Sequence, residues 1–374
     1  MIVDAHEDIA YNALHHDRDV RRPLAQIRAD QRQRAAGVGA SGGRPLGAAG
    51  AGASGGPPRQ PAAGTPLSGM EQTAMLALDA HRRGGVGLVF GTIFVSPGDL
   101  DEMARDGLAQ LAWYEQVAAT EPSPGVRLIS TRAALAALHH DWEAAAMSEA
   151  RPVGLVLLME GADPLPDPAA VRDYYARGLR ILGTSWHGTR YGGGTRAPGP
   201  LTPLGRELLG EMAKLGMVLD ISHMAEETFW QALDAFPGRV IASHSNCRVY
   251  TPTDRHLSDE MIQALAARDA VIGTVLANSF LQGGWKAGDP LLTLDAVVRH
   301  IDHICQLTGT TRHCAIGSDF DGGFGVESTP AELDSVADLG RIGEALAAHG
   351  YSAGDVAGIL GGNWLRLLED ALPD

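Results

Sequence analysis

The chain has 374 residues, of which 45% are hydrophobic, and its formal net charge is −15 at pH 7. This length and this apolar content suit a globular α/β protein with a large buried core. The negative charge argues against a nucleic-acid partner, because phosphate binding requires a basic protein face.

The first predicted element is a short apolar strand at residues 2–5, which runs into the polar residues His6, Glu7 and Asp8. Side chains alternate between the two faces of a strand, so His6 and Asp8 should point to one side and Glu7 to the other. Two ligand-type side chains that converge from one strand end suggest a metal site. A polar loop start is the alternative, and the later elements have to decide between the two.

A segment of different composition follows at residues 37–64 and consists almost wholly of glycine, alanine, proline and serine. It has too few apolar side chains to offset the entropy lost on ordering it. We therefore expect a flexible insertion in a single catalytic domain that spans residues 1–374. A lid over a functional site is the alternative interpretation.

Continuous apolar runs recur along the rest of the chain, as is typical of parallel strands buried on both faces. Helix-like stretches separate many of them, which predicts a (β/α)8 barrel of the TIM type. An open doubly wound sheet is the alternative, but no glycine-rich dinucleotide turn follows the first strand. The strand candidates are residues 2–6, 86–94, 153–160, 179–186, 217–223, 239–244, 270–277 and 314–320. The helix candidates include residues 201–216, 225–236, 258–269, 292–309 and 333–350, with a closing helix pair at 353–372.

Functional side chains of such a barrel lie at the carboxyl ends of its strands. Five of the eight predicted strands end in residue types that bind metals. These residues are His6 and Asp8, Glu160, His223, His244, and Asp319 with Asp321. One histidine at a strand end is more often structural, but five such ends together indicate a metal centre at the barrel mouth.

These histidines and carboxylates together exceed the three protein ligands of a mononuclear catalytic zinc ion. The ligand types therefore suggest two ions, which would lie about 3.5–4 Å apart and need a bridging group. A carboxylated lysine is one common bridge in barrel hydrolases, but neither Lys214 nor Lys286 lies at a predicted strand end. Glu160 is the group in the right place, so we predict that it bridges two Zn²⁺ ions.

The motifs DAHED, MEGAD, DISHM, ASHSN, RHLSDE, GSDFDG and GGNWLRLL occur in this order across nearly the whole chain. In this combination the sequence resembles the membrane dipeptidase (renal dipeptidase) family of zinc peptidases. The resemblance implies that His6, Asp8 and Glu160 hold one zinc ion. It implies that Glu160, His223 and His244 hold the other.

The resemblance also implies catalytic and substrate-binding residues. It places Asp319 beside the attacking hydroxide, where its carboxylate would carry a proton to the leaving amine. It makes Arg255 the group that binds the C-terminal carboxylate of the substrate, whereas a surface arginine paired with Asp254 or Asp259 is the alternative.

The chain departs from the family at the end of the fourth predicted strand, where the family has a substrate-binding histidine. Trp186 occupies that position here, and His187 follows one residue later. A shift of one residue turns a strand side chain to the other face. His187 therefore serves as the substrate-binding histidine only if the strand has already ended; otherwise this segment forms a pocket wall with another specificity.

Together these features predict a metal-dependent hydrolase that cleaves small dipeptides, and the resemblance extends this to dipeptides with a C-terminal D-residue. A second interpretation is another metal-dependent amidohydrolase on the same barrel, acting on an acylated amino acid, a lactone or a phosphoester. A third is a non-catalytic binding protein, which the full set of ligand residues argues against.

The cellular setting follows from cysteine usage and from apolar runs. The chain has three cysteines, Cys247, Cys305 and Cys314, which is an odd number, and their spacing is not that of a metal site. This usage is typical of a protein from a reducing compartment. Only Met1 precedes the first strand, and the apolar runs are too short to span a bilayer. We therefore expect a cytoplasmic protein without a membrane partner, and the sequence is compatible with a homodimer.

Overall fold

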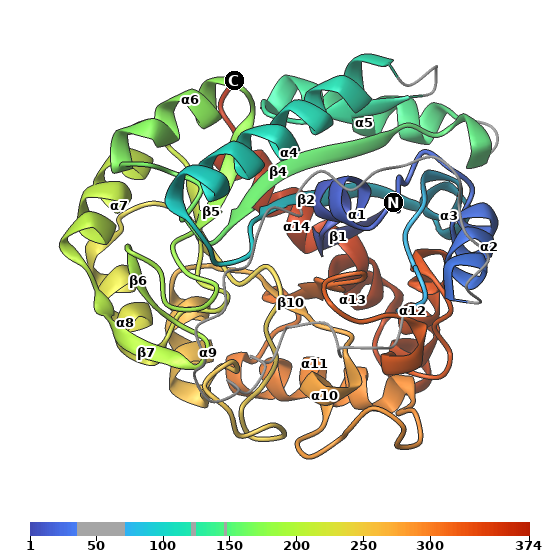
Figure 1. The fold of residues 1–374 in the computed structure, drawn as a ribbon. Coiled ribbons are helices and arrows are strands. Elements are labelled where there is room, and N and C mark those ends of the chain that lie inside the picture. Colours follow the sequence, from blue (N-terminus) through green and yellow to red (C-terminus); the bar gives the residue numbers. More distant parts are fainter. Residues whose placement is uncertain (36–71, 121–124, 146–147) are drawn as a thin grey trace, which may run out of the picture.

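The structure is a computed structural model that describes residues 1–35, 72–120, 125–145 and 148–374. The predicted insertion at residues 37–64 lies outside these described residues. Within the described ranges, helices lie around a central set of parallel strands (Figure 1).

The central strands confirm the predicted barrel. In the described part of the chain, six of them form one parallel path in the order β1-β2-β4-β5-β8-β9, and β10 pairs with β11. These strands are β1 (Ile2–Glu7), β2 (Val86–Phe94), β4 (Val153–Glu160), β5 (Leu179–Gly183), β8 (Val218–Asp220), β9 (Val240–Ile241), β10 (Ile272–Thr274) and β11 (Cys314–Ile316). Each corresponds to one strand candidate from the sequence.

Two parallel bridges close these strands into a ring. Ala242, just after β9, pairs with Ile272 of β10, and Glu7 of β1 pairs with Phe320 beyond β11. The amide of Asp319 also donates to the carbonyl of His6 over 3.1 Å. Because the first and last strands meet in this way, the open doubly wound sheet is excluded.

Several strands end earlier than the sequence predicted. The expected strand 217–223 ends at Asp220, and the expected strand 314–320 ends at Ile316. The reason lies in the backbone, since His223 has φ 66° and Asp319 has φ 61°. A positive φ is costly for a residue with a Cβ, and it turns the chain out of the strand where these polar side chains enter the barrel mouth.

Three described strands lie outside the ring. β3 (Val126–Leu128) extends the sheet beside β4, while β6 (Gly192–Gly194) and β7 (Ala197–Leu201) form an antiparallel pair. No helix of the described residues is long and apolar enough to cross a membrane. The helices are α1 (Ile9–His15), α2 (Leu24–Ala35), α3 (Leu78–Gly84), α4 (Leu100–Thr120), α5 (Arg132–Ala144), α6 (Val171–Ala176), α7 (Pro203–Leu215), α8 (Glu226–Ala235), α9 (Asp259–Ala267), α10 (Asn278–Leu281), α11 (Leu294–Thr308), α12 (Gly340–Ala348), α13 (Ala353–Ala357) and α14 (Asn363–Ala371).

Alternate residues of the ring strands pack into two separate apolar layers. Along β4, Leu155 and Leu157 belong to the larger layer, whereas Val156 and Leu158 belong to a smaller layer that also contains Trp364 of α14. The Trp364 indole donates to the carbonyl of Ile316 over 2.9 Å. α14 therefore packs across the ring with a buried tryptophan, and the strands keep apolar contacts on both faces.

Two glycines allow the strands next to His244 to approach closely. A Cβ on Gly273 would lie 2.0 Å from the Ser243 carbonyl oxygen, and a Cβ on Gly317 would lie 1.9 Å from the same atom. No side chain larger than hydrogen fits at either position without moving the backbone. These glycines therefore set the position of the segment that carries His244.

We expect Gly317→Ala to lower the free energy of unfolding by about 1–3 kcal/mol or more, because its methyl group would overlap a backbone oxygen. Gly210→Ala is the matched control. Gly210 lies in α7, is exposed, and has no described atom within 4 Å of its Cβ position. That control should gain up to about 1 kcal/mol of stability from helix propensity. Chemical denaturation measures both, and equal effects would contradict the close approach.

Candidate active site

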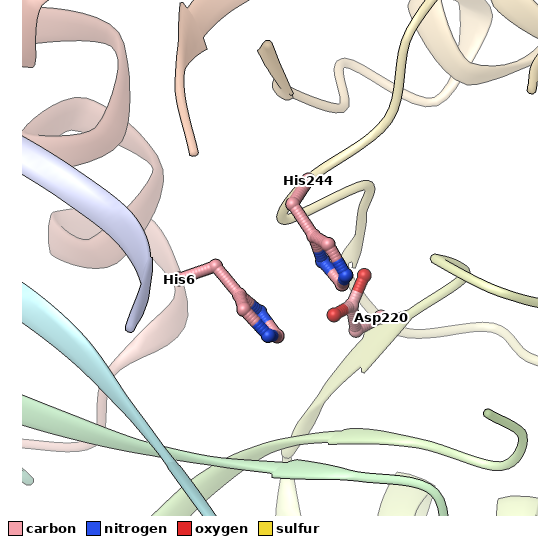
Figure 2. Close-up of side chains that lie close together, drawn as sticks. All are labelled: His6, Asp220 and His244. Atoms are coloured by element: carbon pink, nitrogen blue, oxygen red, sulfur yellow. The ribbon is translucent and has the colours of Figure 1, made fainter. Parts of the chain in front are cut away.

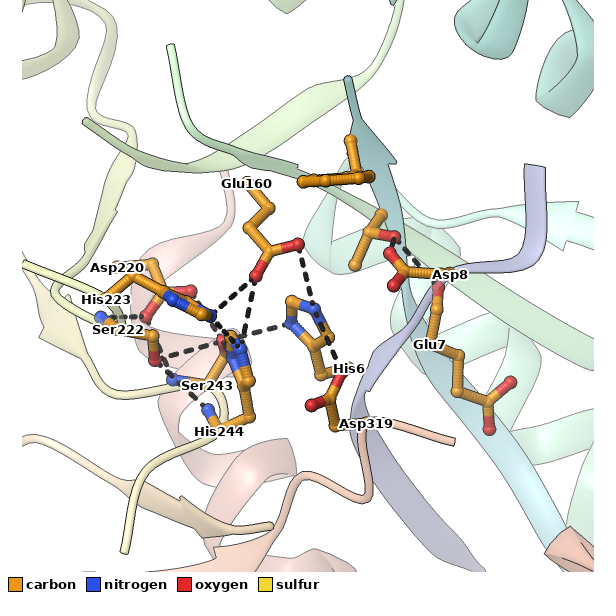
Figure 3. A network of polar contacts seen from close by, with 12 residues as sticks. His6, Glu7, Asp8, Glu160, Asp220, Ser222, His223, Ser243, His244 and Asp319 are labelled. Carbon is orange, nitrogen blue, oxygen red and sulfur yellow. Dashed lines mark hydrogen bonds and ion pairs between the residues drawn. The ribbon is translucent and has the colours of Figure 1, made fainter. Parts of the chain in front are cut away.

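The predicted metal ligands meet at the carboxyl ends of β1, β4, β8 and β9 around the carboxylate of Glu160 (Figure 3). Its Oε1 lies 2.9 Å from His223 Nε2 and 3.2 Å from His244 Nε2. Its Oε2 lies 3.5 Å from His6 Nε2. The two oxygens of one carboxylate thus face two different sets of imidazoles.

Ligand-type atoms gather into two groups that share Glu160. His6, Asp8 and Glu160 form one group, and Glu160, His223 and His244 form the other, with the ligand atoms of each within 4.8 Å of one another. These are the two triads that the resemblance implied. A further group combines His6, Asp220 and His244.

Each of the three histidines is held through Nδ1 by a hydroxyl group. The Ser243 hydroxyl lies 2.8 Å from His244 Nδ1 and 3.3 Å from His6 Nδ1. The Thr195 hydroxyl lies 3.0 Å from His223 Nδ1. This arrangement directs every Nε2 toward Glu160, as is typical of histidines that bind a metal through Nε2.

The burial of the ligand-type atoms and their hydrogen bonds also fit a bound cation. His6 Nε2 is buried and has no hydrogen-bond partner among the described residues. An unpartnered nitrogen in a buried site costs free energy unless a cation or a proton acceptor meets it. The donor set of imidazole nitrogens and carboxylate oxygens suits zinc.

Burial keeps two of the histidines uncharged. It lowers the pKa of His223 to about 4, and nearby Arg255 acts in the same direction. Burial, together with His6 and Arg255, holds the pKa of His244 well below its ordinary value. Neutral imidazoles have the free lone pair that a metal requires.

The carboxylates of the site respond in opposite ways to burial. Burial raises the pKa of Asp8 to about 7 and that of Asp319 well above its ordinary range. Burial acts on Glu160 as well, but the neighbouring imidazoles of His6, His223 and His244 outweigh it, so its pKa falls well below the usual value. Such a concentration of buried acidic groups is stabilised by a bound cation.

His6 is the counter-charge of the metal-free site. Burial disfavours its protonated form, but the carboxylates of Glu160, Asp319 and Asp8 outweigh this and raise the pKa of His6 to about 10. Its Nε2 lies 4.0 Å from Asp319 Oδ1. In the absence of a cation, a proton on His6 therefore compensates part of the buried negative charge.

Glu7 and Asp321 lie apart from the ligand groups. Glu7 turns away from His6 and Asp8, as the strand alternation predicted, and its Oε2 lies 2.8 Å from His81 Nε2 in α3. The carboxylate of Asp321 accepts hydrogen bonds from the amides of Met75 and Leu76. Asp321 therefore anchors the chain before α3. Its position at a strand end had suggested a metal ligand instead.

Arg255 is buried beside the ligands, so the surface interpretation of this residue is wrong. Its Nη2 donates to the His244 carbonyl over 2.7 Å, and its Nη1 donates to the Ser245 hydroxyl over 3.3 Å. The side chain of Asp254 instead accepts from the amide of Arg196. Asp259 pairs with His303 at 2.7 Å.

Trp186 and His187 both follow the end of β5 and line a hollow beside Glu160. The Trp186 ring lies 6.2 Å from the His223 ring and 5.0 Å from the Phe94 ring, centroid to centroid. The His187 ring lies 6.4 Å from that of Trp186. Trp186 thus stands next to the predicted ligand His223, and His187 lines the same hollow.

Sequence reasoning missed the polar residues that support the ligands. The Thr92 hydroxyl donates to Asp8 Oδ1, and the Asp220 carboxylate accepts from the Ser243 hydroxyl over 2.5 Å. A signal was present, since Thr92, Asp220 and Ser243 interrupt apolar runs at strand ends. Their partners are distant in sequence and could not be read from it.

The chain is similar to known proteins in sequence and in fold. The profile of the family described as "Membrane dipeptidase (Peptidase family M19)" matches residues 67–372. An uncharacterized protein from the pqqA 5′ region of Klebsiella pneumoniae is 33% identical over 233 residues, which cover 59% of this chain and 83% of that protein.

Two solved structures show the same fold over nearly the full length. The dipeptidase AC, a metallopeptidase of family M19, superposes with a TM-score of 0.74 at 24% identity, covering 100% of this chain and 99% of its own. A metallopeptidase from Rhodobacter sphaeroides, liganded with a phosphinate mimic of the dipeptide L-Ala-D-Ala, gives a TM-score of 0.70 at 24% identity, with 99% of each chain covered.

The pKa shifts predict how the metal-free protein responds to alkali. The pKa values of about 10 for His6 and about 8 for Asp4 exceed their ordinary values, so the folded state retains protons that the unfolded chain has released. Stability must then fall as the pH rises through these values. The lowered pKa values of His223 and His244 affect stability only below about pH 6.5, where an unfolded histidine is protonated.

We therefore expect the Tm of chelator-treated protein to fall between about pH 7 and about pH 9. Saturating zinc should reduce or reverse this decline, because a bound cation replaces the retained protons. Differential scanning calorimetry with and without zinc measures both curves. A metal-free Tm that rises over this range would contradict the assigned charge distribution.

Proposed function

Because this chain belongs to the membrane dipeptidase family (peptidase family M19) and is a metal-dependent hydrolase, we propose that it is a binuclear zinc dipeptidase acting on small dipeptides. The observation that carries the proposal is the shared carboxylate of Glu160. One of its oxygens faces His6, and the other faces His223 and His244. A carboxylate placed in this way is suited to bridge two ions.

The ligands of the two ions follow from the two groups around Glu160. His6, Asp8 and Glu160 would hold one zinc ion, and Glu160, His223 and His244 would hold the other. Bound there, two zinc ions would lower the pKa of a shared water toward neutrality and polarise the scissile carbonyl. Hydrolysis then needs no serine or cysteine nucleophile.

Asp319 is the proposed proton carrier. Its carboxyl is buried beside His6, and burial raises its pKa well above the ordinary range. A raised pKa makes the carboxylate form a stronger base, which can take a proton from the attacking water, and the acid form can then return that proton to the leaving amine. The positive φ of 61° at Asp319 turns this side chain toward the ligands.

Arg255 is the proposed anchor for the free carboxylate of the substrate. Its guanidinium is buried among the active-site groups and donates to His244 and Ser245, while its Nε has no partner among the described residues. A guanidinium has five N–H donors, so donors remain for a substrate carboxylate. A fixed carboxylate anchor would select dipeptides over longer peptides.

An aromatic wall lies beside Glu160, since Trp186 lines the same hollow as this residue. The Phe94 ring contacts the Tyr11 ring at a centroid distance of 5.2 Å and the Trp186 ring at 5.0 Å. This wall suits an apolar side chain of the substrate, and His187 in the same hollow is a second proposed substrate contact. The dipeptide mimic bound by the Rhodobacter sphaeroides enzyme supports dipeptides with a C-terminal D-residue as candidates.

We expect the purified protein to bind about two zinc ions per chain. Glu160→Ala should abolish both sites together, because each ion loses its shared carboxylate. Metal analysis by mass spectrometry after dialysis measures the content, with Glu102→Ala on the exposed surface of α4 as control. Full metal content and activity in Glu160→Ala would refute the bridging role.

Arg255→Ala should lower kcat/KM for free dipeptides about 30- to 1000-fold, because a charge-assisted pair in a buried site is lost. Zinc content should not change. C-terminally amidated dipeptides should be poor substrates of the parent and little affected by the substitution.

The matched control is Arg239→Ala, which removes a half-exposed arginine just before β9. It should leave both substrates unaffected. If parent and Arg255→Ala cleave free and amidated dipeptides in the same ratio, Arg255 does not bind the carboxylate. That result would favour another metal-dependent amidohydrolase activity on this barrel.

A further inference from the structure

A third group of ligand-type residues shares His6 and His244 with the two groups around Glu160. His6, Asp220 and His244 bring ligand-type atoms within 4.8 Å of one another (Figure 2). All three residues are buried, with exposed fractions of 0%, 2% and 0%. By composition this group resembles a metal site, but its hydrogen bonds assign it another role.

The hydroxyl of Ser243 already lies between these three side chains. It donates to Asp220 Oδ2 over 2.5 Å, and it lies 2.8 Å from His244 Nδ1 and 3.3 Å from His6 Nδ1. The other carboxylate oxygen, Asp220 Oδ1, accepts from the amides of Ser222 and Ser243 over 3.0 and 2.9 Å. The carboxylate is therefore fully engaged with hydrogen-bond donors.

The chemistry of a hydroxyl fixes the direction of each bond. A serine hydroxyl has one proton and two lone pairs, and an ionised carboxylate can only accept. The Ser243 proton therefore goes to Asp220, and the serine oxygen can only accept from the two imidazoles. Both His6 and His244 must then carry a hydrogen on Nδ1. Neutral His244 keeps its Nε2 lone pair on the side of Glu160, and His6 does so once a bound cation replaces its second proton.

We propose that Asp220 and Ser243 are positioning residues that set the Nδ1–H form of His6 and His244 at once, rather than ligands of a third ion. This inference rests on the proposed binuclear function, because His6 and His244 belong to different ions in that assignment. One hydroxyl thus prepares one ligand of each ion. Thr195 does the same for His223 alone.

Asp220→Asn gives the sharpest variant. The backbone amides of Ser222 and Ser243 would hold the amide oxygen of Asn at the Oδ1 position. Its NH2 group would then point at the Ser243 oxygen and reverse the bond. The serine proton would turn to an imidazole Nδ1, which favours a hydrogen on Nε2 and blocks the lone pair that faces Glu160.

Zinc affinity measured by competition with a chromophoric chelator tests this arrangement. Ser243→Ala should weaken both zinc positions about 10- to 100-fold, as expected when an orienting partner of a ligand is lost. Asp220→Asn should weaken both at least as much. Thr195→Val is the matched control, which removes one orienting hydroxyl and should weaken only one position.

A second readout requires no substitution. In metal-free parent protein, nitrogen-15 NMR of the histidine rings should show His244 with its hydrogen on Nδ1. Calorimetry of each metal-free variant shows whether the substitution destabilises the fold. A purely structural role would lower the Tm, but it would not weaken two zinc positions in Ser243→Ala and only one in Thr195→Val.

The two hypotheses fail in different ways. A parent protein that binds fewer than about two zinc ions would refute the binuclear function, and the NMR result would still decide the orientation of His244. A parent that binds two ions, with unchanged affinity in Ser243→Ala, would overturn the positioning role. A hydrogen on His244 Nε2 in the metal-free parent would also overturn it.

Discussion

The site depends on the buried carboxylate of Glu160, which lies between three imidazoles. Glu160 is the last residue of β4, which pairs with β2 along most of its length. A buried carboxylate is tolerated only when charged or hydrogen-bonding partners meet each oxygen. Those partners lie at the ends of β1, β8 and β9, so the site is complete only when these strands close into the ring.

Part of the backbone strain lies at the barrel mouth. Among the described non-glycine residues with positive φ, His223, Asp319 and Asp321 lie just beyond strand ends there. Each costs on the order of 1–3 kcal/mol, and such residues persist where the surrounding structure over-determines them. Here the close approach of Gly273 and Gly317 to Ser243 and the hydrogen bonds of Asp220 supply that surrounding structure.

The sequence was sufficient for the barrel and for the residues that gather in it, because buried parallel strands give apolar runs and ligand residues recur at their ends. It was insufficient for the strand ends, since a positive φ leaves no mark in residue type at His223 or Asp319. It also missed the pairing of Glu7 with His81 and the hydroxyl of Ser243 between His6 and His244. These contacts join segments that only the closed ring brings together.

Ring closure between distant segments has a consequence for folding. β1 is synthesised before its bridge partner Phe320 and before Trp364, whose indole packs against the ring. His6 and Ser243 are separated by 237 positions. The edge of β1 that faces away from β2 therefore stays unpaired, and the group around His6 stays incomplete, until these later segments have been made.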